Sequence, residues 1–362
     1  MLYLLQQLFI NQVSFFRIFK SLAIRGSIAF FVALLLTLIF GGKIIDILRA
    51  KKLGDKIREE GPSSHLSKAG TPTMGGIIII SAIIIAMLVA GNFTNKYTVF
   101  LFCMTILFTY IGFYDDYLKL TKSKKGLSGK KKLLGQLIMS LITFLFILKF
   151  RLSGTEVDFS LVNPFIKNSY LYIGAFAFFI FICFVVIGSS NAINLTDGLD
   201  GLVSGPIMIV SIIFLMIAYF AGHKELSLYL NIYYIEGAGE IAVYLSAVIG
   251  AIIGFLWFNF YPAQVFMGDT GSLTLGGILG MIAIFVKQEF LLPIAGFVFI
   301  AEALSVIIQV LYFKRTHKRI FKMAPIHHHF EMGGLPETKV TVRFWIITII
   351  MCIIAFMILK IR

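Results

Sequence analysis

The sequence predicts an all-α, polytopic integral membrane protein with about ten transmembrane helices, and two observations carry this prediction. Of the 362 residues, 59% are hydrophobic and only 14% are charged, whereas soluble domains carry about a quarter charged residues. Apolar runs long enough for a helix to cross the hydrocarbon core, which takes about 20 residues, recur along the chain. These runs are continuous rather than alternating, which favours helices over the strands of a barrel.

We expect residues 1–362 to form a single membrane domain. The spans are predicted at 25–45, 74–91, 97–114, 133–150, 170–189, 203–221, 240–258, 271–286, 290–313 and 343–360. Residues 1–20 are apolar but too short to span, and we expect an interfacial helix there. No small-residue cleavage site follows them, so a removable signal peptide is not expected. Three cysteines lie inside apolar runs and are interpreted as buried thiols rather than a disulfide framework: Cys103, Cys183 and Cys352.

The distribution of basic residues predicts which loops are cytoplasmic. Three loops, 43–68, 119–132 and 314–343, hold 21 of the 32 lysines and arginines. The positive-inside rule places these loops in the cytoplasm, together with the loops after the fifth and seventh spans, and it places both termini outside. Topology and anionic lipid account for most of the net charge of +14. No nucleic-acid motif interleaves with the basic runs, so no nucleic-acid partner is expected.

The unusual polar motifs all fall at the predicted cytoplasmic ends of the spans. Taken singly, each has an ordinary structural interpretation: a solvated helix end, an N-cap or glycine turn, or a topology determinant. The motifs are SKAGTPTMGG with Lys68 and Thr71; FYDDYLKL with Asp115, Asp116 and Lys119; NAINLTDGLDGL with Asn191, Asn194, Asp197 and Asp200; WFNFYPAQVFMGDTGSL with Asn259, Phe266 and Asp269; and MAPIHHHFE with His327, His328 and His329.

Taken together, the motifs predict a metal and diphosphate site. Five aspartates from three loops share one membrane face, and such carboxylates repel one another unless a cation neutralises them. Oxygen ligands without cysteine favour Mg²⁺ or Mn²⁺, and Mg²⁺ held by carboxylates and substrate phosphates is typical of phosphoryl transfer. Lys68, Lys119 and Lys131 suit a polyanionic substrate. The sequence contains no P-loop and no strand-linked GxGxxG motif. A nucleotide-linked donor and a lipid acceptor are therefore expected to meet here.

Six motifs, in order and over nearly the whole chain, resemble the phospho-N-acetylmuramoyl-pentapeptide transferase family of the polyprenyl-phosphate N-acetylhexosamine-1-phosphate transferase superfamily. They are TPTMGG, FYDDYLK, NAINLTDGLDGL, WFNFYPAQVFMGDTGSL, KQEFLLP and MAPIHHHFE. The resemblance implies a Mg²⁺-dependent enzyme of the bacterial cytoplasmic membrane, with ten spans, periplasmic termini and a cytoplasm-facing active site. It also implies transfer of phospho-MurNAc-pentapeptide from UDP-MurNAc-pentapeptide to undecaprenyl phosphate, release of UMP, and a homodimer.

The resemblance also implies roles for individual residues. Asp115, Asp116 and Asp269 would be catalytic, with Asp269 as the metal ligand and Asp115 as a base or charge partner for the lipid phosphate. The departures from the family pattern, Ile193 and Thr270, remove no ligand. The donor-binding residues would be Lys68, Thr71, Lys119, Lys131, Asn191, Asn194, Asp197, Asp200, Asn259, Phe266 (stacking on uracil), His327, His328 and His329.

Two alternatives and one mechanistic choice stay open at this point. A polyprenyl-phosphate GlcNAc-1-phosphate transferase would keep the chemistry and change the sugar. An ion-coupled transporter is disfavoured because the acids lie at span ends and no inverted repeat is apparent. The reaction can proceed by direct attack of the lipid phosphate or through an acyl-phosphate on an aspartate, and the direct route is favoured.

Overall fold

The structure, a computed structural model, describes residues 1–9, 14–51, 70–121, 126–152, 156–163, 165–166 and 169–361. Predicted site residue Lys68 lies outside the described residues. In the part of the chain that is described, nine helices are long and apolar enough to cross a membrane. They are α2 (Leu22–Ala50), α4 (Lys96–Thr121), α5 (Gly129–Phe150), α6 (Gly174–Thr196), α7 (Ser204–Ala221), α9 (Gly239–Asn259), α10 (Gly268–Phe285), α12 (Phe297–Thr316) and α14 (Glu337–Ile361).

A tenth apolar helix, α3 (Gly76–Ala90), occupies the second predicted span but has only 15 residues. Its length gives about 22 Å at 1.5 Å per residue, less than the roughly 30 Å of a hydrocarbon core. The prediction of a helical, multi-span membrane protein is confirmed, while the count of ten spans and the orientation of the termini stay predictions.

Shorter elements refine three of the predicted boundaries. Among the described residues of 1–20, Leu2–Phe9 forms the α-helix α1 and Ser14–Lys20 forms the 3-10 helix η1. The span expected from 170 begins at Gly174, because Tyr170–Tyr172 forms strand β2, antiparallel to β1 (Ser160–Val162). The span expected over 290–313 is interrupted at Gly296, between α11 (Leu291–Ala295) and α12. The remaining short elements are η3 (Glu156–Phe159), α8 (Lys224–Tyr229) and α13 (Ile326–Glu331).

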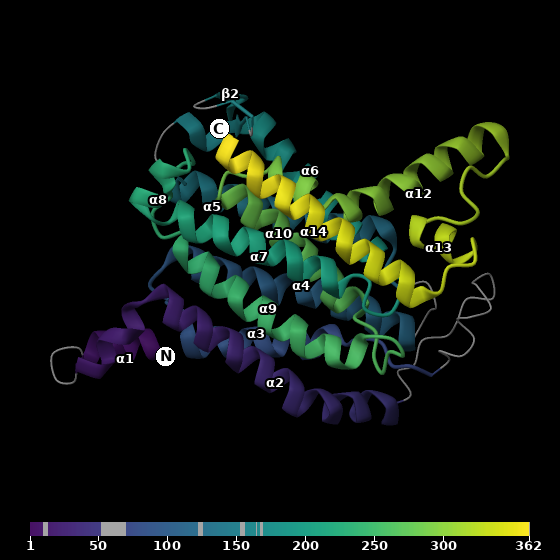
Figure 1. Ribbon diagram of the computed structural model, residues 1–362, viewed down its shortest axis with the longest axis horizontal. Helices are drawn as coiled ribbons and strands as arrows, with labels where there is room; N and C mark the ends of the chain where they lie inside the picture. The colour runs from purple at the N-terminus through teal and green to yellow at the C-terminus, as the bar shows by residue number, and fades with distance from the viewer. Residues whose placement is uncertain are drawn as a thin grey trace.

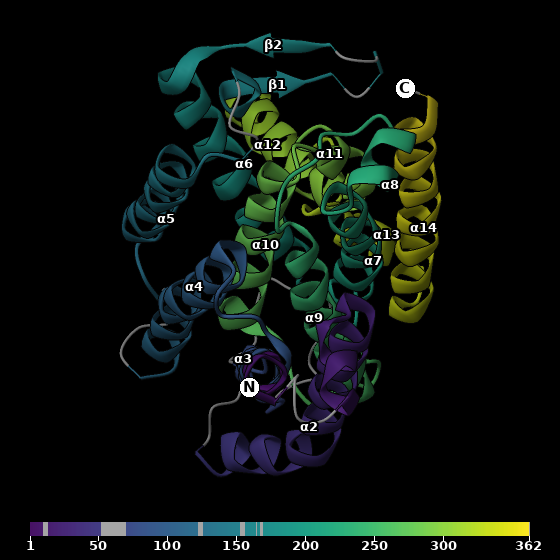
Figure 2. The same cartoon turned by 90° about the vertical axis from the view of Figure 1, so that its left-hand side faces the viewer.

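Helix α10 lies at the centre of the bundle, with α4 and α5 on one side and α7 and α14 on the other (Figure 2). All but one of its 18 residues are buried. Glycines permit close contact with the neighbours: a Cβ at Gly276 would lie 2.7 Å from the Ser189 carbonyl oxygen of α6, and one at Gly277 would lie 2.5 Å from the Phe108 ring of α4. Small residues bring helices together in this way in membranes. The result is a rigid central helix whose first turn carries Asp269.

The two ends of the bundle differ in what they carry. The chain termini, α8 and β2 lie toward the left of Figure 1, whereas α13 and the free end of α12 project on the right. A buried ion pair joins Arg25 at the start of α2 to Glu240 at the start of α9, with nitrogen–oxygen distances of 2.5 and 2.7 Å. This pair lies at the opposite end from the last turn of α4 and the first turn of α10, where the acidic motifs meet.

Candidate active site

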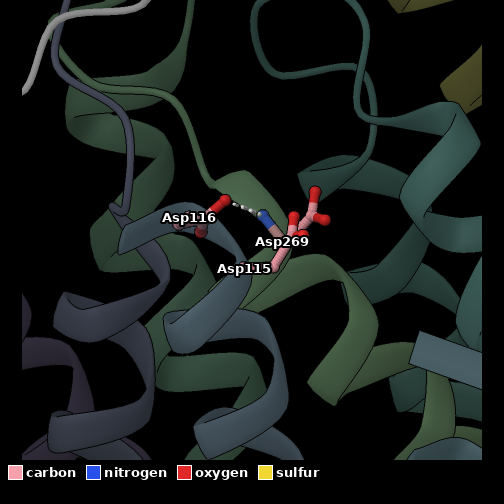
Figure 3. A group of neighbouring side chains, drawn as sticks. All are labelled: Asp115, Asp116 and Asp269. Atoms are coloured by element: carbon pink, nitrogen blue, oxygen red, sulfur yellow. Dashed lines mark hydrogen bonds between the residues drawn. The ribbon is translucent and has the colours of Figure 1, made fainter. Parts of the chain in front are cut away.

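Three predicted carboxylates meet where α4 ends and α10 begins. Asp115 and Asp116 lie near the C-terminus of α4, and Asp269 lies in the first turn of α10. One oxygen of each lies within 4.8 Å of the others, and all three residues are buried (Figure 3). Gly112 makes the meeting possible, because a Cβ at that position would lie only 2.3 Å from the Asp269 carbonyl oxygen. The backbone of α10 at Asp269 therefore packs directly against the backbone of α4 at Gly112, beside the cluster.

Asp116 fixes the start of α10. Its Oδ1 accepts a hydrogen bond from the Asp269 backbone nitrogen at 3.2 Å, drawn in Figure 3. Its Oδ2 accepts from the Thr270 backbone nitrogen at 2.9 Å and from the Thr270 hydroxyl at 2.7 Å. A carboxylate on the free N–H groups of a helix N-terminus also complements the positive end of the helix dipole. Both Asp116 oxygens are thus used in positioning Asp269.

Asp115 and Asp269 each present one oxygen to two lysines. The Lys119 ammonium lies 2.7 Å from Asp115 Oδ2 and 3.0 Å from Asp269 Oδ2. The Lys132 ammonium, at the start of α5, lies 2.8 Å and 2.5 Å from the same two oxygens. The Asp115 Oδ1 atom accepts instead from the Leu127 backbone nitrogen at 2.6 Å. Two positive charges therefore neutralise much of the negative charge of the cluster.

The NAINLTDGLDGL motif supplies the next layer of contacts. Asn194 donates to Asp269 Oδ1 at 2.9 Å and to the Ser272 hydroxyl at 2.8 Å. Asp197, just beyond the end of α6, accepts from the Gly268 backbone nitrogen at 3.1 Å. Burial, followed by the nearby Asp269 carboxylate, raises the pKa of Asp197 to about 7. Asn191, one helical turn before Asn194, donates to Gln136 of α5 at 2.9 Å.

The TPTMGG motif packs directly against the segment that leads into α10. The Phe266 nitrogen donates to the Pro72 carbonyl oxygen at 2.9 Å, and the Gly75 nitrogen donates to the Phe266 carbonyl oxygen at 2.8 Å. A Cβ at Gly76 would lie 2.2 Å from the Gly271 nitrogen, so only glycine allows this approach. Thr71 and the Phe266 ring are partly exposed beside this contact. The predicted stacking of Phe266 on a uracil ring remains a prediction.

Two predicted donor-binding residues hold loops in place. Asp200 accepts from the Ala263 nitrogen at 2.9 Å through Oδ2, and its own backbone nitrogen donates to Glu337 at 2.6 Å. Asn259 accepts from the Ser204 hydroxyl at 2.9 Å and donates to the Val265 carbonyl oxygen at 2.9 Å. Both side chains are buried. They join the loops after α6 and α9, and their predicted contact with the donor remains a prediction.

The three histidines of MAPIHHHFE face different partners. His327 is buried, with its Nδ1 atom 3.1 Å from Glu302 Oε2 of α12. Its Nε2 atom touches the loop after α6, since a Cβ at Gly198 would lie 2.2 Å from it. The His328 Nδ1 atom lies 2.7 Å from a Glu331 oxygen, and His329 accepts from the Lys322 backbone nitrogen at 3.1 Å. The structure therefore places His327 against the Asp197–Asp200 loop.

Lys132 is a site residue that the sequence reasoning missed. The prediction named Lys131, which is exposed on the outer face of α5, whereas the adjacent Lys132 reaches the cluster. A signal existed in the helical spacing. Lys132 is four residues before Gln136, which begins a buried polar stripe that continues through Ser140 and Thr143. Glu302, the partner of His327, was missed as well.

The donor set fits a hard divalent cation. The ligand atoms that meet at the cluster are all carboxylate oxygens, from Asp115, Asp116 and Asp269. Such oxygens suit Mg²⁺ or Mn²⁺, whereas soft metals select sulfur. The two lysine ammonium groups beside the carboxylates show that the cluster already stabilises positive charge. The arrangement suits chemistry on phosphate groups.

Comparisons with known proteins agree with this geometry. The family model described as Glycosyl transferase family 4 matches residues 97–287, which is more than half of the chain. Residues 68–80 match the phospho-N-acetylmuramoyl-pentapeptide-transferase signature 1. A phospho-N-acetylmuramoyl-pentapeptide-transferase of Fusobacterium nucleatum is 55% identical over 95% of both chains. One of Endomicrobium trichonymphae is 46% identical over 96% of both chains. The chain therefore belongs to the phospho-N-acetylmuramoyl-pentapeptide-transferase family.

Proposed function

We propose that this protein transfers phospho-MurNAc-pentapeptide from UDP-MurNAc-pentapeptide to undecaprenyl phosphate, forming the lipid-linked diphosphate lipid I and releasing UMP. The observation that carries the proposal is the buried Asp115–Asp116–Asp269 cluster, with two lysine ammonium groups on it, in a chain 55% identical to a relative named for muramoyl-peptide transfer. That name favours a muramoyl donor over GlcNAc. The acids lie at helix ends rather than in the middle of the spans, and this disfavours an ion-coupled transporter.

We assign the metal site to Asp269, with Asp115 beside it, and the metal to Mg²⁺. The Oδ2 atoms of both carboxylates face the same two ammonium groups. They are held in that orientation by donors on their Oδ1 atoms, Leu127 N and Asn194 Nδ2. When bound, Mg²⁺ would neutralise negative charge on the diphosphate of the donor.

The direct reaction needs one bond formed and one bond broken. An oxygen of the lipid phosphate attacks the β-phosphorus of the donor, and the bond from that phosphorus to the bridging oxygen breaks. UMP then leaves with that oxygen and its electron pair. Asp115 accepts the proton of a monoanionic lipid phosphate, or orients the dianion through charge. A covalent relay through a carboxylate adds little, because the acceptor phosphate is already an anionic nucleophile.

The lysines and Asp116 have supporting roles in this scheme. Lys119 and Lys132 contact the proposed metal-binding carboxylates, and positive charge beside the reacting phosphates would stabilise the transition state. Asp116 holds the first turn of α10, and with it Asp269, in register with α4. Its predicted catalytic role is thus a positioning role in this proposal.

The donor pocket is proposed to lie beside the cluster, on the side formed by the loops after α6 and α9. Asn194 and Asp197 contact the first turn of α10, and Phe266 precedes it by two residues. Lys68, Thr71, Lys131 and the three histidines remain proposed contributors. The family resemblance also supports a homodimer.

The protein is proposed to lie in the bacterial cytoplasmic membrane with this site facing the cytoplasm. The basis is the concentration of lysine and arginine in the loops at the acidic end of the bundle. Single cysteines replacing Lys130 and Lys224, in a background without the native cysteines, provide the check. In spheroplasts, a membrane-impermeant thiol reagent should label position 224 and spare position 130. Labelling of both, or of position 130 alone, would contradict the orientation.

The proposed activity is tested by reconstitution of the purified protein in detergent with undecaprenyl phosphate and Mg²⁺. With UDP-MurNAc-pentapeptide we expect UMP and a lipid-linked product in equal amounts, and with UDP-GlcNAc we expect neither. The Asp269→Asn variant is the matched control for contaminating enzymes. A product formed from UDP-GlcNAc in preference to the muramoyl donor would overturn the proposed substrate.

A further inference from the structure

The carboxylate oxygens of the acid cluster fall into two classes. Four of them accept hydrogen bonds from fixed donors: Asp115 Oδ1 from Leu127 N, Asp269 Oδ1 from Asn194 Nδ2, and both Asp116 oxygens from the start of α10. The other two, Asp115 Oδ2 and Asp269 Oδ2, contact the Lys119 and Lys132 ammonium groups. The second pair is therefore held by charged lysine side chains, whereas the first four oxygens accept from backbone N–H groups, the Thr270 hydroxyl and the Asn194 amide.

A divalent cation and both ammonium groups cannot share these two oxygens. A Mg²⁺ ion binds carboxylate oxygen at about 2.0–2.1 Å. The Lys132 nitrogen already lies 2.5 Å from Asp269 Oδ2 and 2.8 Å from Asp115 Oδ2. A cation on the same pair would meet the ammonium at close range, with strong repulsion in a buried site of low dielectric constant. At least one ammonium has to leave when the cation binds.

The geometry selects Lys132 as the group that leaves. Lys119 follows Asp115 by four residues and Asp116 by three on the same helix, so α4 itself keeps its ammonium near both carboxylates. Lys132 instead reaches the cluster from α5, after a turn in which Gly126 adopts a positive φ of 62°. The Lys132 and Lys119 side chains are 21% and 35% exposed, so both have a path to solvent, and the tether of Lys119 to the helix that carries Asp115 is what distinguishes them.

We propose that Lys132 is an internal counter-cation of the acid cluster: its ammonium holds Asp115 and Asp269 together before metal binds, and it leaves their Oδ2 atoms when the metal binds. The released ammonium is then free to contact a phosphate of the donor. Metal loading and phosphate binding are thereby linked through one side chain. This inference rests on the metal site proposed above and deepens it.

A metal titration without substrates tests the inference. Mn²⁺ serves as the probe, and the free ion is measured by electron paramagnetic resonance against purified protein in detergent. Removing a unit charge next to the metal should lower the Mn²⁺ dissociation constant of Lys132→Gln by about tenfold or more. Lys130→Gln removes the same charge from an exposed position two residues away and should change it little. Equal or weaker Mn²⁺ binding by Lys132→Gln would overturn the proposal.

The Asp269→Asn variant separates this inference from the metal site itself. We expect it to lose Mn²⁺ binding. If it binds Mn²⁺ as the parent does, the proposed metal site is wrong and the counter-cation role falls with it. If Asp269→Asn fails to bind while Lys132→Gln binds no more tightly than the parent, only the counter-cation role is overturned.

A measurement on the unaltered chain avoids any effect of the substitutions on folding. Lysines are acylated in a short pulse with and without saturating Mn²⁺, and labelling is quantified residue by residue by mass spectrometry. Lys132, an ion-paired amine, should be protected without Mn²⁺ and become several-fold more reactive with it, while exposed Lys130 stays constant. Lys132 remaining as protected with Mn²⁺ as without it would contradict its departure from the cluster.

Discussion

A methyl group at position 112 would collide with the backbone that carries Asp269. A Cβ at Gly112 would lie 2.3 Å from the Asp269 carbonyl oxygen and 2.7 Å from the Thr270 Cα, whereas ordinary contact begins at 3.4 Å. Neither neighbour is a flexible side chain that can rotate away. In Gly112→Ala, the helices α4 and α10 must therefore separate locally by about 1 Å, the difference between these distances.

The separation acts directly on the acid cluster. Asp115 and Asp116 lie within the next turn of α4, and Asp269 is the residue that is pushed. A misplacement of about 1 Å costs about a hundredfold in rate. Overpacking costs about 1–3 kcal/mol of stability, and alanine returns about 1 kcal/mol through helix propensity. We therefore expect a large fall in turnover with a small change in stability.

The assay is the initial rate of UMP release, with thermal unfolding in detergent measured on the same samples. Gly188→Ala is the matched control, because a Cβ at Gly188, on α6, would meet nothing within 4 Å. This control should keep the parent rate. If Gly112→Ala turns over as fast as Gly188→Ala, the contact between α4 and α10 does not set the geometry of the site.

Three further predictions follow from the same contacts. Asp269→Asn should lower turnover severely and blunt its dependence on Mg²⁺ concentration, because an amide oxygen is a poorer ligand for a hard cation; a near-normal rate at low Mg²⁺ would show that Asp269 is not the ligand. Asp115→Asn should lose most activity at low pH and regain part of it at high pH. The lipid phosphate, with a second pKa of about 6, becomes a dianion at high pH without help from a base. A near-zero rate throughout the pH–rate profile would contradict the assignment of Asp115 as the base. Arg25→Met should lower the free energy of unfolding by about 3–5 kcal/mol, because it leaves Glu240 buried without its ion-pair partner. Adding Glu240→Leu should restore much of that loss in denaturant unfolding, and a double variant less stable than Arg25→Met would refute the reasoning.

The long helices could be predicted from the sequence, but the points where they are interrupted could not. Continuous apolar runs predict spans because lipid leaves the backbone no other partners, and the long helices follow those runs. The break at Gly296 was not predictable, because apolar residues continue on both sides of it. The strand at Tyr170–Tyr172 was assigned to a span for the same reason. Hydropathy identifies what lies in the membrane and is insensitive to a local turn.

The acid cluster was predictable because topology and motif pointed the same way. Alternating loops share a membrane face, so Asp115, Asp116 and Asp269 were expected together, and the structure brings one oxygen of each within 4.8 Å of the others. The individual partners were not predictable. The choice between Lys131 and Lys132 depends on the rotation of α5, and the capping role of Asp116 depends on the approach of α10. Both are set by tertiary packing rather than by local sequence.

The central claim is that a sugar phosphate, rather than a sugar, moves to the lipid. Donor labelled with ³²P at the β-phosphate tests it directly in the reconstituted reaction with undecaprenyl phosphate and Mg²⁺. We predict that the label passes into the lipid phase as the diphosphate product, while unlabelled UMP remains in the aqueous phase. Label that stays in the aqueous phase as UDP, with an unlabelled lipid product, would mean transfer of the sugar alone and would contradict the account.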